Sequence, residues 1–138
     1  MIGPQTRVRS VPVSKKLLNP TFETARELAN ELAADQGMRR LLPPDCTNFL
    51  SEYHMEAEGC WYFFPREDVE IPPERWTLRG LGIAIFKSGD CRLAYDFRPN
   101  EQKMQEYLEI MSLFALNRVE EARAAHDVFH AKWGEATD

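Results

Sequence analysis

Hydrophobic and polar residues alternate over residues 49–57, and an aromatic run, Cys-Trp-Tyr-Phe-Phe, occupies residues 60–64. Only Glu58 and Gly59 separate the two stretches. Two-residue loops are typical of β-hairpins, in which successive side chains of each strand point to opposite faces. The pattern therefore predicts a hairpin of two antiparallel strands with Glu58-Gly59 at its turn.

In this register the two faces of the hairpin differ in character. One face is apolar and includes Tyr53. On the other face, Glu56 lies opposite Trp61. His54 lies opposite Phe63 on the same face. Carboxylates mixed with large aromatic rings are unusual both for a solvated face and for a core, so we expect a contact surface. The candidate partner-binding residues are Glu52, His54, Glu56, Glu58, Trp61 and Phe63. The alternative is that a helix or the 65–79 loop covers Trp61 and Phe63, which are then core residues.

A second hairpin is indicated by the apolar residues on both sides of Ser88-Gly89. Placing these two residues at the turn sets Phe86 opposite Cys91, whereas a shifted register would set Lys87 against Arg92. We therefore expect the first register. Gly82, near the start of the first strand of this hairpin, indicates a bulge or the close approach of another backbone.

Helical spacing of apolar residues appears on both sides of the two hairpins. Residues 20–36 form one candidate helix, which follows Asn19 and ends near Gly37. A second apolar stripe runs over residues 101–133. A continuous helix of that length would measure about 50 Å, more than the width of such a domain. The pattern therefore predicts a break near Leu116-Asn117 and two C-terminal helices.

These elements predict an α+β fold in a single domain spanning residues 1–138. We expect an antiparallel sheet of about four strands, made from the two hairpins and packed against an N-terminal helix and one or two C-terminal helices. One face of the sheet is expected to be covered and the other open. Residues 1–18, which contain four basic residues and no acidic one, are interpreted as a basic arm or an edge strand.

Composition and charge narrow the possible partners. Hydrophobic residues make up 43% of the chain and charged residues 28%, with no apolar stretch long enough for a membrane helix. The segment from residue 52 to residue 75 contains seven acidic residues and only two basic ones, Arg66 and Arg75. It therefore accounts for the whole net charge of −5. The acidic residues are Glu52, Glu56, Glu58, Glu67, Asp68, Glu70 and Glu74. Such a segment repels nucleic acid and attracts a basic protein, although acidic loops can also serve solubility alone.

The residues that most often carry chemistry give weak motifs. Three cysteines without a C-x-x-C pair suggest free thiols, a cytoplasmic location and no cofactor. His126 and His130 have the spacing of the two zinc-binding histidines in H-E-x-x-H, but Asp127 replaces the glutamate and no third histidine follows. A cysteine nucleophile made from Cys60 and His54 is disfavoured, because the two side chains point to opposite faces.

The order of elements resembles that of the small bacterial immunity proteins that accompany polymorphic toxins. The likeness covers residues 45–115 and consists of an aromatic strand ending W-Y-F-F-P, the run G-L-G-I-A-I, the turn K-S-G-D and a final amphipathic helix. The resemblance implies a cytoplasmic protein that binds a cognate toxin and blocks it. It assigns no functional residue by position.

The sequence therefore leads to one main hypothesis and two alternatives. The main hypothesis is a non-enzymatic, immunity-type inhibitor that binds a basic protein partner through the acidic and aromatic face. The first alternative is a metal-dependent hydrolase that uses His126 and His130. The second is a homo-oligomeric structural protein whose aromatic residues form a symmetric interface.

Overall fold

The computed structural model describes residues 11–12 and 17–134, without the side chains of residues 11, 12, 76 and 77. In chain order the elements are β1 (Val11–Pro12), α1 (Phe22–Ala33), η1 (Ala34–Met38), α2 (Arg39–Leu41), β2 (Leu50–Glu56), β3 (Cys60–Pro65), η2 (Pro73–Arg75), α3 (Trp76–Arg79), β4 (Leu81–Phe86), β5 (Cys91–Tyr95), α4 (Glu101–Ala115) and α5 (Val119–Trp133). The expected α+β fold, with its antiparallel sheet, N-terminal helix and two C-terminal helices, is confirmed.

Helix α1 begins two residues later than the sequence predicted. Thr21, and not Asn19, is the capping residue, because its side chain accepts a hydrogen bond from the Thr24 amide while the Thr24 hydroxyl accepts one from the Thr21 amide. This reciprocal pair satisfies two backbone donors that a helix start leaves without partners. After Ala33 the chain continues through a π-helical turn, where Gly37 has φ +128°.

The strands form one sheet in the order β1-β5-β4-β3-β2. The first hairpin has the predicted register, because Glu56 pairs with Trp61 and His54 with Phe63. Its turn is the expected two-residue loop, closed by a 2.9 Å hydrogen bond from the Ala57 amide to the Cys60 carbonyl oxygen. Towards the start of β2 the register shifts in a bulge between Leu50 and His54.

The predicted register of the second hairpin is wrong by one residue. Cys91 pairs with Ile85 and not with Phe86. The Phe86 amide instead donates to the Asp90 carbonyl oxygen at 2.7 Å, which leaves a loop of three residues, 87–89. Gly89, the last of the three, has φ +109°, a conformation that glycine adopts readily and that closes three-residue hairpin loops.

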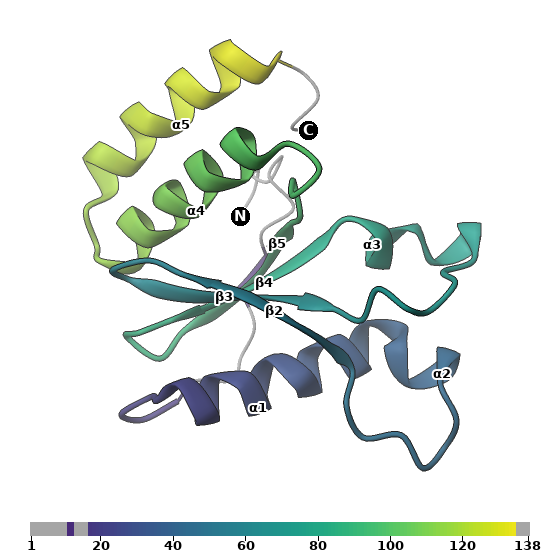
Figure 1. Cartoon of the computed structure of the whole chain (residues 1–138). Helices are drawn as coiled ribbons and strands as arrows, with labels where there is room; N and C mark the ends of the chain where they lie inside the picture. Colours follow the sequence, from purple (N-terminus) through teal and green to yellow (C-terminus); the bar gives the residue numbers. More distant parts are fainter. Residues whose placement is uncertain (1–10, 13–16, 135–138) are drawn as a thin grey trace.

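Helices cover both faces of the sheet, so the expected open face is not observed. Figure 1 shows α1 on one side of the strands and α4 with α5 on the other. The side chains of β3 and β4 are buried at every position. An uninterrupted apolar strand is typical of a sheet covered on both faces. In this chain that pattern was a stronger signal than the mixed polar and aromatic face of the first hairpin, from which an open face was expected.

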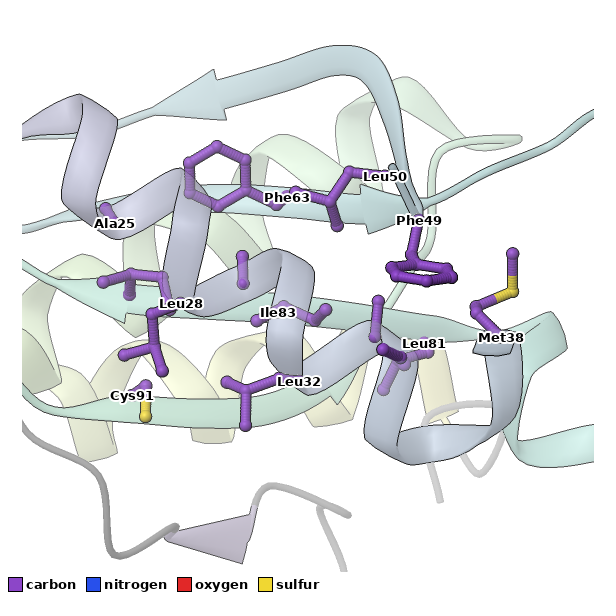
Figure 2. Close-up of a cluster of buried hydrophobic side chains, with 14 of the residues drawn as sticks. Ala25, Leu28, Leu32, Met38, Phe49, Leu50, Phe63, Leu81, Ile83 and Cys91 are labelled. Carbon is purple, nitrogen blue, oxygen red and sulfur yellow. The ribbon is translucent and has the colours of Figure 1, made fainter. Parts of the chain in front are cut away.

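Each face has its own hydrophobic core. Figure 2 shows the core under α1, where Leu28 and Leu32 of the helix lie against Phe63 and Ile83 of the sheet. The second core lies under α4 and α5, and it includes Tyr62 together with a set of α4 side chains and Phe129. Adjacent residues of β3 therefore enter different cores, which is the direct result of strand alternation.

The predicted break between the C-terminal helices is confirmed. Asn117 has φ +62°, and α5 begins at Val119 after this turn. Near its end α5 is joined to α4 through Glu106, which accepts hydrogen bonds from Lys132 Nζ at 2.8 Å and Trp133 Nε1 at 3.0 Å. None of the helices in residues 17–134 is long and apolar enough to cross a membrane.

The N-terminal segment is described only in part. Val11 and Pro12 form the edge strand β1, which pairs with β5 through Val11–Leu93 and Pro12–Arg92. The other basic-arm residues before residue 17 lie outside the described part of the chain.

Candidate partner-binding surface

The two aromatic residues predicted to contact a partner are core residues in the structure. Phe63 is fully buried and Trp61 is 8% exposed. Helix α1 covers this face, and the Phe22 ring lies 5.8 Å from the Phe63 ring. Lys87 Nζ further covers Trp61, at 5.2 Å from the ring centroid. The expected exposure of Trp61 and Phe63 is therefore wrong, and neither ring is accessible to a partner.

The four polar candidates remain at the surface, because β2 is the last strand of the sheet. Glu52, His54, Glu56 and Glu58 are all exposed. Glu56 forms an ion pair with Lys87 at 2.6 Å, and the His54 ring lies 4.7 Å from the Phe22 ring. In residues 17–134 Glu52 makes no ion pair. The structure thus keeps these four side chains on one edge of the sheet, where the His54 ring lies 6.0 Å from the buried Phe63 ring.

The backbone of β2 also faces outward at this edge. Ala57 and Cys60 form a hydrogen-bonded pair at the turn. In antiparallel strands such pairs alternate with pairs that exchange no hydrogen bonds. Counting back from Ala57, the pairs Glu56–Trp61 and His54–Phe63 are of the second type. The amide and carbonyl groups of Glu56 and His54 therefore point away from β3, towards the open side of β2.

A groove lies beside β2 on the face that carries α4. It encloses about 590 Å³. Tyr53 and Met55 line it from β2, and Glu101 lines it from the first turn of α4. The remaining lining residues are Glu67, Arg98, Met104 and Gln105. The groove combines an aromatic ring and two methionine side chains with two carboxylates, which suits a long side chain that has an apolar stem and a cationic end.

The exposed aromatic residue at this edge is Tyr53, and not Trp61 or Phe63 as the sequence predicted. Its side chain is 49% exposed and stacks on Phe64 with ring centroids 5.8 Å apart. The sequence placed Tyr53 correctly on the face that carries Phe64. Its exposure depends on β2 being an edge strand, which two hairpins alone do not determine.

Arg98 lines the groove and is held from several sides. Its guanidinium carbon lies 3.8 Å from the Phe64 ring centroid, and the group forms ion pairs with Asp96 at 2.8 Å and Glu67 at 2.5 Å. Partial burial opposes its charge, but the hydrogen bonds and charges of Asp96 and Glu67 outweigh this and raise the pKa of Arg98. Arg98 is therefore a fixed cation whose charge is already balanced by carboxylates of this chain.

Charge along this edge is predominantly negative. Its basic side chains are already paired: Arg66 with Asp68 at 2.7 Å, and Lys87 and Arg98 as described above. Glu52 and Glu101 make no ion pair with any residue in the described ranges. A second, smaller groove of about 300 Å³ continues the surface past the bulge and is lined in part by Glu52 and Asp68. The surface as a whole therefore favours a cationic ligand.

The two histidines of the metal hypothesis lie on α5. The rings of His126 and His130 are 6.3 Å apart, and both side chains are partly buried. In the part of the chain that the structure describes, no group of three His, Cys, Asp or Glu side chains is placed to hold a metal ion. The two histidines are on the helix that lies furthest from α1, on the opposite side of the sheet (Figure 1).

Cys60 lies in the core under α4, whereas His54 lies against α1, as the strand alternation predicted. Burial raises the pKa of the Cys60 thiol to about 12, against a smaller opposing effect of Lys87. The thiol is therefore protonated at neutral pH and is not a nucleophile in the folded protein.

Comparison with known proteins gives no family model that matches the chain, no match among the curated proteins and no match among the solved structures. We therefore infer the function from the geometry and charge of the β2 edge.

Proposed function

We propose that this protein is a non-enzymatic, immunity-type inhibitor that acts in the cytoplasm by binding a basic protein, such as a toxin, at the edge formed by β2. The observation that carries the proposal is an exposed edge strand with outward backbone groups, beside a groove and a set of surface carboxylates. Tyr53 takes the role of aromatic contact residue, because it is exposed at the centre of this edge.

The charge pattern supports an inhibitor that binds a cationic site. Glu52 and Glu101 make no ion pair within the described part of the chain, and Glu58 is exposed at the end of the hairpin. Carboxylates of this kind mainly increase the association rate of an oppositely charged partner. Blocking a basic active-site cleft requires such attraction and needs no catalytic group on the inhibitor.

The experiment has two steps. The tagged protein is used to capture partners from lysate of its native host at low and at moderate salt, and each captured protein is then purified. The purified partner is assayed for its own activity with and without this protein. We expect one basic partner whose toxic or enzymatic activity falls on addition of an equimolar amount of the inhibitor.

Two charge-reversal variants make the test specific. Glu52→Lys reverses one charge on the proposed binding surface, and Glu27→Lys makes the same charge reversal at an exposed position of α1. We expect Glu52→Lys to slow association by about tenfold at low salt and Glu27→Lys to leave it nearly unchanged. Equal effects of the two variants, or a bound partner whose activity is unaffected, would contradict the proposal.

A further inference from the structure

We propose that the open edge of β2 receives an extended, basic segment of the partner as an additional strand of the sheet. This inference rests on the proposed function and specifies how the partner is bound. The sheet would then continue past β2, with backbone hydrogen bonds supplying affinity and alternate side chains supplying specificity.

The backbone of β2 has the geometry that strand addition needs. His54 and Glu56 each direct one amide donor and one carbonyl acceptor to the open side, as the pairing at Ala57 requires. An extended segment alongside them can satisfy all four groups. Exposed edges of this kind pair readily with another chain unless the protein protects them.

The two edges of the sheet differ in their protection. At the opposite edge, the described part of β1 is Val11–Pro12, and Pro12 has no amide donor. Strand β2 has seven residues, with neither proline nor lysine among them. Its bulge lies between Leu50 and His54, so the half from His54 to Glu56 keeps regular pairing with β3. Among the residues that the structure describes, the edge at β2 is therefore open to addition.

Charge identifies the segment that fits. Side chains on one face of an added strand would lie over the groove, where Tyr53 offers an aromatic surface and Glu101 offers a carboxylate, while Glu67 is already paired with Arg98. Lys or Arg at these positions can place its stem on Tyr53 and its charge near Glu101. On the other face, Glu56 is 53% exposed and can contact a second basic side chain.

The same charges disfavour a second copy of this chain as the occupant. Two β2 strands in antiparallel contact would bring Glu52 and Glu56 from both copies to one short interface, where Lys87 balances only the charge of Glu56. Like charges across neighbouring strands are destabilising. We therefore assign the edge to a basic segment of a different protein.

A peptide probe tests the edge before the partner is identified. The probe is a capped peptide of alternating lysine and valine, added at low salt to isotope-labelled protein while amide resonances are recorded. Its matched control carries N-methyl groups on alternate residues, which removes backbone donors but keeps the charge. We expect saturable shifts of the His54 and Glu56 amides with the probe and none with the control. Equal binding of both peptides would show that only charge is recognised and would overturn strand addition.

A pair of variants tests the same point with the captured partner. His54→Pro removes the outward amide, whereas His54→Ala removes the imidazole and keeps the amide. We expect His54→Pro to bind the partner about tenfold more weakly than His54→Ala. Equal affinities, together with weak binding of Glu52→Lys, would overturn strand addition and leave the proposed function intact.

Two further measurements keep the result decisive. If His54→Pro does not fold, hydrogen exchange of the wild-type complex replaces it, and protection of the His54 and Glu56 amides is the expected result. Unprotected amides in the complex would overturn the inference. Sedimentation of the isolated chain supplies the remaining test, because a dimer that His54→Pro dissociates would show that a second copy occupies the edge.

Discussion

The amide of Gly59 donates a 2.8 Å hydrogen bond to the hydroxyl oxygen of Ser112, which ties the turn of the first hairpin to α4. The contact between the turn and α4 leaves no room for a side chain at residue 59. A Cβ atom at residue 59 would lie 2.6 Å from the Ser112 carbonyl oxygen and 2.9 Å from Leu116 Cγ. The hairpin that carries the proposed binding edge is therefore held in place by its contact with α4.

Gly59→Ala is expected to lower the free energy of unfolding by about 1–3 kcal/mol, because the methyl group forces α4 and the turn apart. Urea denaturation measures the change. Gly80→Ala is the matched control, since a Cβ atom there meets nothing within 4 Å. Equal stability of the Gly59→Ala and wild-type proteins would mean that the turn can move away from α4 without loss.

Trp61→Ala and Phe63→Ala should act as core mutations. Both side chains are buried beneath α1, so each truncation is expected to cost about 3–5 kcal/mol of unfolding free energy. Tyr53→Ala, at the half-exposed ring on the neighbouring strand, is expected to cost much less. Thermal unfolding of the three variants checks the order. A Trp61→Ala protein as stable as Tyr53→Ala would contradict the packing beneath α1.

Sequence patterns predicted most of the elements because their signals are local. The register of the first hairpin follows from strict alternation and a two-residue loop at Glu58-Gly59, and it is confirmed. The second register was wrong because a favourable charge arrangement was given more weight than Gly89, whose positive φ closes a longer loop. Charge pairs at exposed turns contribute little, so backbone geometry decides such a case.

The candidate site was harder to predict because it depends on long-range packing. His54 and Glu56 were placed on the correct face, but the sequence did not show that α1 covers their partners Trp61 and Phe63. The groove residues Glu67, Arg98 and Glu101 come from segments that no local pattern brings together with Tyr53. The uninterrupted apolar runs of β3 and β4 were the available signal that helices cover both faces.

The three cysteines should differ in reactivity. Cys60 and Cys91 are buried, whereas Cys46 is partly exposed. At pH 8 we expect an aromatic disulfide reagent to modify Cys46 alone in the folded protein, and all three thiols after denaturation. Mass spectrometry of the labelled peptides identifies the sites. Rapid labelling of Cys60 in the native protein would contradict its burial and its raised pKa.

The contact between α4 and α5 should weaken in acid. The hydrogen bond from Lys132, followed by that from Trp133, lowers the pKa of Glu106 below the ordinary value for a glutamate. A carboxylate whose pKa is lower in the folded state contributes stability above its unfolded pKa and loses that contribution as the pH falls through the folded value. Glu106→Gln should therefore be less stable than wild type at pH 7, by at most about 1 kcal/mol, and equally stable near pH 2.

Chemical denaturation at the two pH values measures this difference. Glu109→Gln, which removes a carboxylate from an exposed position on the same helix, provides the control for the loss of one negative charge. A constant difference between Glu106→Gln and wild type at both pH values would assign the effect to packing and not to charge.

Strands β3 and β4 supply side chains to the cores on both faces of the sheet, and this arrangement has a consequence for folding kinetics. Neither α1 nor α4 has an apolar surface to pack against until these two strands are paired. Pairing them requires closure of the connection over residues 66–80, a loop much longer than a hairpin turn. We therefore expect this closure to limit the folding rate. Mutations in β3 should slow folding, whereas mutations in the peripheral helix α5 should mainly accelerate unfolding.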